Sequence, residues 1–415
     1  MVDTPGAILF AYYYYPANTS GVQRAARLAK YLPENGFRMQ VITTSEEGVC
    51  AGMPGVHHVP DSPAGWTSGE WRHRASRLAQ RIVPYNEQLL WVPHAVEAAS
   101  RIVAREGDVR SILSTSPPVG SHLAAYWTKR RYPQLRWVAD FRDPILGNPN
   151  RARQWARPYD AALERLIFSC ADVVIAVSDA FVETWKKNHP AMAHKFHVIW
   201  NGFDPEDAFG PKTIPARSRR VLLHAGVLYR QRHPKAMLAA LDRLIEGGRL
   251  NPDDILVRFL GHLQGAEELT AMPFVKRLTQ RGCLELDGKS VPRPEAMDQI
   301  ATADWLFLID ILSLDGAGYT VPAKIFDYLL TGRPVLAITD RDAPVDMILE
   351  SCGIPSVRLY HSEPEEETEA KLLRLFSLPS EPVKPSQWFV ERFDGREQAK
   401  AVAGHLRWPA AGGQR

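Results

Sequence analysis

The chain has 415 residues, of which 45% are hydrophobic and 23% are charged, a composition typical of globular proteins with room for two domains. Its net charge of +3 is small for this length and no nucleic-acid-binding module is recognisable, so we expect no nucleic acid among its partners. The cysteines form no C-x-x-C pair and indicate neither a zinc site nor a disulfide framework: Cys50, Cys170, Cys283 and Cys352.

The N-terminus lacks a basic segment ahead of its apolar run at 7–15, and no apolar stretch in the chain approaches 18 residues. We therefore expect neither a signal peptide nor a membrane span. Isolated thiols are typical of a reducing compartment. These features predict a cytoplasmic protein.

Short apolar runs alternate with helical patterns through the first half of the chain. The predicted strands are 7–11, 39–43, 111–114, 136–139, 173–177 and 197–200. Helical segments follow several of them, at 22–32, 119–131 and 180–188. This alternation predicts an α/β fold with a parallel, doubly wound sheet.

One segment of the first half, 66–83, reads as a basic amphipathic helix. It carries tryptophans and arginines at helical spacing: Trp66, Trp71, Arg72, Arg74, Arg77 and Arg81. Such a helix could rest on anionic lipid or on a lipid-linked acceptor, which would place the protein at the inner face of a membrane. A plain surface helix is the alternative.

The pattern changes near residue 202, where a polar, proline-rich stretch without periodicity predicts an interdomain linker at 203–217. A second alternating series follows, with strands at 221–225, 256–260, 284–286, 305–309, 335–338 and 356–359, and the tail at 387–408 has helical spacing. We predict an N-terminal domain at 1–202, a C-terminal domain at 218–384 and a terminal segment at 385–415. Open α/β sheets bind ligands outside the carboxyl ends of their strands, so we expect a site in a cleft between the two domains.

Polar motifs follow the predicted strands of the first domain. Gly21 ends the loop after the first strand and would let backbone approach a phosphate, and Arg24 lies in the first turn of the next helix. An ordinary turn with a solvent-facing Arg24 is the alternative. Thr115 and Ser116 end another strand, where they are candidates to line the acceptor or sugar pocket, and the helix that follows carries His122. His122 is a candidate catalytic residue; the alternative is a structural role, which is the more common one for a lone helical histidine.

Asp140, Arg142 and Asp143 alternate in charge at the end of the next strand. One interpretation is that they hold the acceptor or line a sugar pocket. The other is an Arg–Asp pairing that shapes the floor of the site. A carboxylate such as Asp143 could accept a proton from a hydroxyl group, but the residues alone do not establish a base.

The most informative stretch is 318–338, which reads as a loop, a short helix, a glycine turn and a buried strand. Lys324 adds a positive charge near the helix start, and Asp327, three residues on, is placed to accept hydrogen bonds from a ribose diol. An amphipathic helix with solvated charges is the alternative. The loop before the helix offers backbone N–H groups to an anion through Gly318, Tyr319 and Thr320.

This stretch resembles the donor-binding region of family 4 glycosyltransferases with the GT-B fold, in the subgroup written V-P-x-K-x-[FY]-[ED]-Y-x-x-x-G-[RK]-P. The D-F-R-D-P segment at 140–144 and the opening strand, loop and helix are similar to that family too. The usual motif has two acidic residues separated by seven others; Asp327 falls on the second, and Tyr319 falls on the first. Since that first acid normally lies beside the donor sugar, we expect the backbone of the 316–320 loop to take over part of its role.

The resemblance implies further roles in the second domain. The family commonly has a lysine six residues after the glycine that ends the first strand of this domain, and counting from Gly226 places Arg232 there. We expect Arg232 and Lys324 to contact the donor diphosphate as the catalytic cations. Weaker candidates for the donor site are Arg230 and, around the nucleotide base, Gly261 and Val291.

Together these features predict a hexosyltransferase-type enzyme that moves a sugar from a nucleotide-diphosphate donor, UDP-linked, to an acceptor hydroxyl. The resemblance implies retention of the anomeric configuration, no metal and no cofactor, and a final helix that crosses back onto the first domain. The acceptor is left open as a lipid-linked sugar, a saccharide of a polysaccharide pathway or a small molecule. A nucleotide-sugar epimerase or phosphorylase, and a binding protein without transfer activity, are the alternatives.

Overall fold

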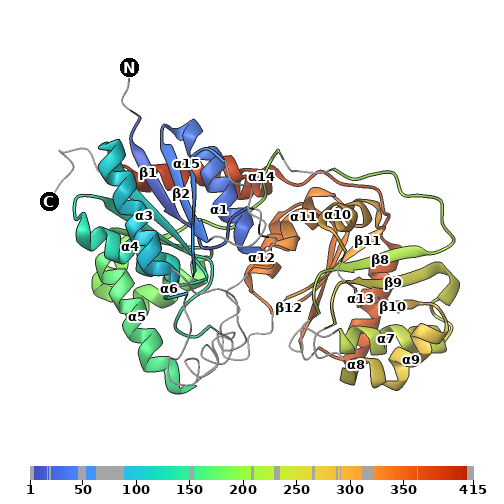
Figure 1. The fold of residues 1–415 in the computed structure, drawn as a ribbon. Helices are drawn as coiled ribbons and strands as arrows, with labels where there is room; N and C mark the ends of the chain where they lie inside the picture. Colours follow the sequence, from blue (N-terminus) through green and yellow to red (C-terminus); the bar gives the residue numbers. More distant parts are fainter. Residues whose placement is uncertain are drawn as a thin grey trace, which may run out of the picture. The chain divides into compact units, whose positions relative to one another are not determined.

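The computed structural model describes residues 4–15, 17, 20–44, 53–61, 88–148, 154–206, 210–228, 234–263, 267–286, 288–289, 291–310, 321–361 and 363–408. The chain forms two compact units (Figure 1). The first contains Met1–Gly202 and Asp394–Arg415, and the second contains Phe203–Phe393.

The described residues of the first unit form a seven-stranded parallel sheet in the order β3-β2-β1-β4-β5-β6-β7. The strands are β1 Gly6–Phe10, β2 Arg38–Thr44, β3 Val56–Val59, β4 Val109–Ser116, β5 Arg136–Phe141, β6 Val173–Ala176 and β7 Phe196–Val198. The strand order reverses between β1 and β4, so the carboxyl ends of these two strands form a topological switch point, where such sheets bind ligands.

Helices cover both faces of this sheet, which explains why its strands read as continuous apolar runs. On one face, α1 and α15 lie side by side and share a core with alternate residues of β1, Leu9 among them (Figure 1). On the other face, the ring of Phe10 contacts that of Trp91 on α3, with 6.4 Å between the ring centroids. The helices are α1 Ser20–Tyr31, α3 Trp91–Glu106, α4 Gly120–Arg131, α5 Arg157–Cys170, α6 Asp179–Asn188 and α15 Gly395–Leu406.

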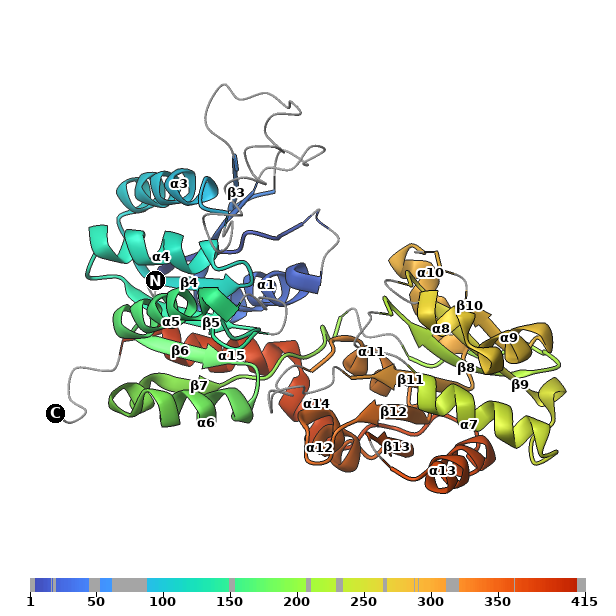
Figure 2. The ribbon, with the colours of Figure 1, turned by 90° about the horizontal axis from the view of Figure 1, so that it is seen from below.

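The described residues of the second unit also form a parallel sheet, with six strands in the order β10-β9-β8-β11-β12-β13. Its strands are β8 Arg220–Ala225, β9 Ile255–Leu260, β10 Leu284–Leu286, β11 Trp305–Ile309, β12 Val335–Thr339 and β13 Ser356–Tyr360. Helices α7 and α13 lie side by side in this unit (Figure 2). The helices are α7 Lys235–Glu246, α8 Glu267–Ala271, α9 Pro273–Gln280, α10 Arg293–Thr302, α11 Lys324–Leu330, α12 Pro344–Ser351, α13 Glu365–Ser377 and α14 Gln387–Phe393.

The chain passes from one unit to the other at 202–203 and again at 393–394, whereas the sequence placed the second passage at 384–385. The reason lies in α14, whose Phe389 and Phe393 pack on Phe203 and Phe326 of the second unit. Asp394 then starts α15, because its side chain accepts a hydrogen bond from a backbone N–H of the first turn. The described part of the predicted linker also bonds to the second unit, where Lys212 donates to the carbonyl of Ala301 through its backbone N–H.

The predicted fold class, two doubly wound parallel sheets with helices on both faces, is confirmed. The edge strand β3 was not predicted, because His57 and His58 interrupt its apolar pattern. In the part of the chain that the structure describes, no helix combines the length and the apolar character needed to cross a bilayer.

Candidate functional site

Two glycines mark the carboxyl edge of the second sheet, where the order reverses between β8 and β11. Gly226 follows β8 and Gly261 follows β9, with φ of 134° and 131°. The two loops run together: the N–H of Gly226 donates to the carbonyl of Leu260 at 2.7 Å, and a Cβ on Gly261 would lie 2.7 Å from the Gly226 carbonyl oxygen. The edge therefore has no side chain at these two positions, and a side chain at Gly261 would collide with the backbone of Gly226.

Lys324, the first residue of α11, reaches this edge. A Cβ on Gly226 would lie only 2.6 Å from the Lys324 Nζ, so the ammonium lies directly over the glycine. The same nitrogen is 3.3 Å from Nε2 of His224, the penultimate residue of β8. Three residues predicted separately, Gly226, Gly261 and Lys324, thus come together at the switch point.

Asp327 lies one turn further along α11 and is about a quarter exposed. Its carboxylate forms an ion pair with Arg293, the first residue of α10, at 3.7 Å. Val291 lies two residues before Arg293, so the predicted ribose and base residues belong to neighbouring helix starts. Sequence reasoning did not single out Arg293.

Several predicted donor residues lie outside the described residues. They are Arg230, Arg232, Gly318, Tyr319 and Thr320, and the amphipathic segment 66–83 lies outside as well.

At the switch point of the first sheet, Arg24 and Asp140 are enclosed and bonded to each other. Nε of Arg24 donates to both carboxylate oxygens of Asp140 at 3.1 and 2.9 Å, and Nη2 donates to Oδ1 at 2.7 Å. Arg24 also donates to the carbonyls of Ile199 and Trp200, and Thr115 donates its hydroxyl to Asp140 at 2.8 Å. This is the pairing that the sequence left open, formed with a partner on α1, and these contacts tie α1 to β4, β5 and the 199–200 segment.

Arg142 and Asp143, which follow β5, are partly exposed. Nε of Arg142 donates to the carbonyl of Ser116 at 3.0 Å, and a Cβ on Gly21 would lie 3.1 Å from the Arg142 Nη1. Gly21 therefore makes room for a guanidinium of its own unit. Burial raises the pKa of the Asp143 carboxyl above its ordinary value, although the neighbouring Arg142 opposes the shift.

His122 is fully enclosed. Its Nδ1 lies 2.8 Å from the Ser114 hydroxyl, which also accepts a hydrogen bond from the Trp137 indole, and its ring lies against Phe141. Burial lowers the pKa of His122 to about 3, so the ring is neutral at physiological pH. An imidazole with this pKa is a weak general base, and its surroundings are those of a packing residue.

Glu164, a carboxyl group inside the apolar stripe of α5, was not among the residues predicted from the sequence. It is 1% exposed and accepts a hydrogen bond from the backbone N–H of Leu146 at 3.1 Å. Burial raises the pKa of Glu164 to about 7. Glu164 therefore anchors the loop that begins with Arg142 and Asp143.

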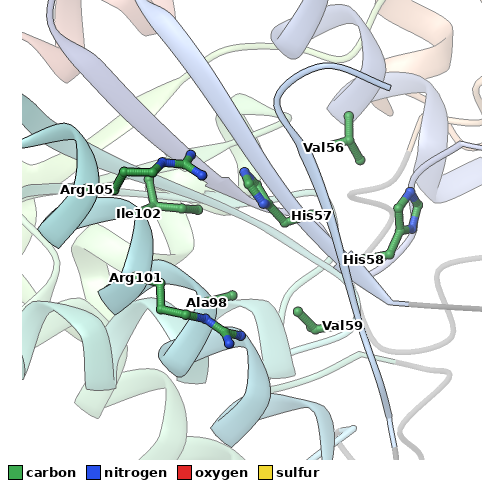
Figure 3. A pocket seen from close by; sticks show the side chains of 8 residues that line it. All are labelled: Val56, His57, His58, Val59, Ala98, Arg101, Ile102 and Arg105. Carbon is green, nitrogen blue, oxygen red and sulfur yellow. The ribbon is translucent and has the colours of Figure 1, made fainter. Parts of the chain in front are cut away.

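A cavity of about 390 Å³ lies between β3 and the last turns of α3 (Figure 3). His57, Arg101 and Arg105 contribute its polar groups. His57 bonds to the side chain of Gln40, and both arginines are mostly exposed and lie beside glutamates of their own helix. Exposed ion pairs of this kind contribute little energy, and the cavity lies at the edge of the sheet, away from the switch point. We therefore assign this cavity no part in the candidate site.

The sequence model of the Glycosyltransferase Family 4 matches residues 20–207, less than half of the chain. No curated protein matches the chain. Among solved structures, the chain is similar to the lipopolysaccharide outer core galactosyltransferase WaaB in its apo form, with 14% identity and a TM-score of 0.61 over 97% of this chain and 98% of that one.

Two other solved structures are similar over nearly their whole length. A UDP-forming α,α-trehalose-phosphate synthase from Burkholderia xenovorans, in complex with glucose-6-phosphate, has 11% identity and a TM-score of 0.62 over 97% of this chain and 100% of that one. A UDP-N-acetylglucosamine 2-epimerase has 11% identity and a TM-score of 0.50 over 96% and 91%. Likeness at these identities establishes the fold, which is that of GT-B glycosyltransferases.

Proposed function

We propose that the protein is a glycosyltransferase that moves a sugar from a UDP-linked donor to an acceptor hydroxyl. The observation that carries the proposal is the ammonium of Lys324, held over Gly226 at the switch point of the second sheet. A cation beside two side-chain-free strand ends suits a diphosphate, which needs positive charge and close approach of backbone. The family model over 20–207 and the UDP-forming structural neighbour support the choice of reaction and donor.

Charge on the diphosphate is the central problem of this reaction. The bond between the anomeric carbon and the diphosphate oxygen breaks, and the acceptor oxygen forms a bond to that carbon. The electron pair of the broken bond stays on the leaving diphosphate as negative charge, and the acceptor hydroxyl gives up its proton to the diphosphate or to water. Lys324, with Arg232 as the second cation, would stabilise that charge without a metal. One preorganised donor of this kind supplies about 2.7–4 kcal/mol at the transition state.

We assign the ribose hydroxyls to Asp327, whose carboxylate accepts hydrogen bonds, and the base to the loops at Gly261 and Val291. In the first unit we assign the acceptor to Arg142 and Asp143, since Arg24 and Asp140 are occupied with each other. Retention of configuration is proposed from the resemblance to the family.

The test is direct. The purified protein is offered a panel of nucleotide sugars, with saccharide and lipid-linked acceptors, and the products are identified by mass spectrometry. The expected result is a glycosylated acceptor and free UDP, unchanged in yield when a chelator is added. If nucleotide sugars bind but neither glycosylated acceptor nor free UDP accumulates, transfer is excluded.

A second candidate, a nucleotide-sugar epimerase, is favoured by the likeness to the 2-epimerase structure. The two reactions differ in product: the epimerase returns an isomerised sugar, whereas the transferase requires an acceptor. Isomerised sugar formed without any acceptor would replace the first proposal. A binding protein without transfer activity is the third candidate, because Tyr319 stands where the family motif has an acidic residue. Binding of the donor without any turnover would favour it.

A further inference from the structure

We propose that His224 is a positioning residue for the donor diphosphate, because it holds the ammonium of Lys324 in one place. The inference rests on the proposed role of Lys324 in glycosyl transfer. His224 was not among the site residues predicted from the sequence.

His224 is 0% exposed and its ring is fixed from both sides. It contacts the rings of Phe259 and Phe307, with centroid separations of 5.5 and 5.9 Å. These phenylalanines come from β9 and β11, the two strands that flank β8. The imidazole therefore has little freedom to turn.

Hydrogen bonding then decides which nitrogen carries the proton. Nδ1 lies 2.8 Å from the backbone oxygen of Phe307, which can only accept, so Nδ1 carries a hydrogen. Nε2 lies 3.3 Å from the Lys324 Nζ, and an ammonium can only donate. The neutral ring with its lone pair on Nε2 satisfies both partners, whereas a doubly protonated ring would turn a second donor toward the ammonium.

The start of α11 is fastened to the same segment by Tyr328, one turn after Lys324. The Tyr328 hydroxyl accepts a hydrogen bond from the N–H of Ala225 at 2.8 Å, and its side chain is 0% exposed. Gly226 completes the arrangement by leaving space for Nζ. Lys324 and Tyr328, four residues apart on α11, thus meet three consecutive residues, His224, Ala225 and Gly226.

Such an arrangement would help catalysis because it restrains the ammonium of a lysine, whose side chain is otherwise flexible and whose charge is otherwise mobile. One of the three ammonium N–H groups is directed at Nε2, and this orients the other two. A preorganised cation stabilises developing charge without reorganising during the reaction. Loss of His224 should therefore lower turnover more than it weakens ground-state binding.

Two variants at this position separate orientation from packing. His224→Phe keeps an aromatic ring but removes the acceptor, and we expect kcat to fall at least about tenfold with a smaller change in KM. His224→Gln offers an amide oxygen that can accept from the ammonium, and it should recover most of the lost turnover. His57→Phe, the same change on β3 of the first unit, is the control and should leave turnover near that of the wild type.

A double-mutant cycle provides the decisive comparison. If His224 acts through Lys324, His224→Phe has no further effect on kcat in a protein that already carries Lys324→Met. The inference would be overturned if the two substitutions lowered kcat independently, so that their fold-changes multiplied. It would also be overturned if His224→Gln lost as much turnover as His224→Phe.

Failure of the proposed function is recognised separately. Titration of the wild type with UDP tests nucleotide binding, and the ¹⁵N resonances of the His224 ring report its protonated nitrogen in the free protein. We expect a proton on Nδ1 and a shift of the Nε2 resonance in Lys324→Met. If UDP does not bind but the NMR result is as expected, the proposed glycosyl transfer is rejected while the His224–Lys324 contact stands. A ring protonated on Nε2 would reject the positioning role of His224 itself.

Discussion

Burial separates the charged residues at the switch point of the first sheet into two pairs. Arg24 and Asp140 are 2% and 0% exposed, and each guanidinium nitrogen of Arg24 donates a hydrogen bond inside the protein. Arg142 and Asp143 are partly exposed. An enclosed and bonded ion pair gives the fold its geometry, whereas charges that solvent reaches can meet a ligand.

We expect Asp140→Asn to lower the free energy of unfolding by about 3–5 kcal/mol, because Arg24 would keep its charge in an enclosed place without a carboxylate. Urea unfolding followed by circular dichroism measures the change. Asp143→Asn is the control and should alter stability by no more than about 0.5 kcal/mol. A stable Asp140→Asn protein with lost turnover would favour the acceptor contact that the sequence also allowed.

For the second unit, Lys324→Met should lower kcat by about a hundredfold to a thousandfold while the fold stays intact, because the charge on the leaving diphosphate loses a preorganised donor. Initial rates at saturating donor measure this.

Arg232→Ala should lower turnover by at least about tenfold for the same reason. Near-normal rates in either variant would remove that residue from the mechanism.

At the scale of elements, the strand ends of the second sheet depend on glycine. The loops after β8 and β9 continue the parallel pairing beyond the strands, since the N–H of Leu228 donates to the carbonyl of His262 at 2.9 Å. Gly226 and Gly261 both have positive φ, and neither has room for a side chain: a Cβ on Gly261 would meet the backbone of Gly226, and a Cβ on Gly226 would meet the ammonium of Lys324. The bare edge thus follows from two backbone conformations that other residues rarely adopt.

Gly226→Ala should destabilise the protein by about 1–3 kcal/mol, since alanine would be strained at this φ. It should also lower turnover, because the new methyl group would displace the ammonium of Lys324. Gly404→Ala is the matched control: with open space around Gly404 on α15, the same change should be neutral or stabilise by up to about 1 kcal/mol. Thermal unfolding and initial rates of both variants test these expectations. Equal changes in stability and turnover in Gly226→Ala and Gly404→Ala would contradict them.

At the scale of the whole molecule, the chain ends on the unit where it begins. The last helix, α15, packs on α1, and the carbonyl of Leu406 accepts a hydrogen bond from the Ser111 hydroxyl at 2.8 Å. The rings of His405 and His197 lie 4.3 Å apart, and Arg136 donates to the His405 carbonyl. Burial lowers the pKa of His405 to about 4, with help from His197 and Arg136, and burial also lowers the pKa of His197.

These shifts predict that α15 docks less firmly in acid. Because both folded pKa values lie below the ordinary value of about 6.5, the unfolded chain takes up protons first as the pH falls. The stability from the neutral pair is complete above about pH 6.5 and is lost toward pH 4.

Unfolding at about pH 7.5 and pH 5 tests this, with His405→Gln as the comparison, because carboxyl groups such as Glu164 shift stability in the opposite sense. The wild type should lose more stability than His405→Gln between the two pH values. Equal losses in the two proteins would contradict the assignment.

Much of the fold and part of the site could be read from the sequence. Apolar runs alternating with helical patterns predicted all six strands of the second sheet, because strands buried on both faces must be apolar throughout. The lysine at a helix start predicted an anion site, and the resemblance to family 4 glycosyltransferases implied donor-binding roles for the glycines after β8 and β9; the structure brings these three residues together. β3 was not predicted, because this edge strand contains two histidines and so lacks a continuous apolar run.

The amino-acid pattern alone specifies the order of the elements and the residue types at the strand ends. The partners of these residues are set by the folding of the chain: Arg24 contacts Asp140, 116 residues away, and His224 contacts Lys324, 100 residues away. Periodicity reports which way a side chain faces along its own element, but the group it meets depends on how distant elements pack. For that reason Arg24, predicted as a donor-binding residue, bonds inside the protein, and His224, for which no role was predicted, lies 3.3 Å from the cation of the candidate site.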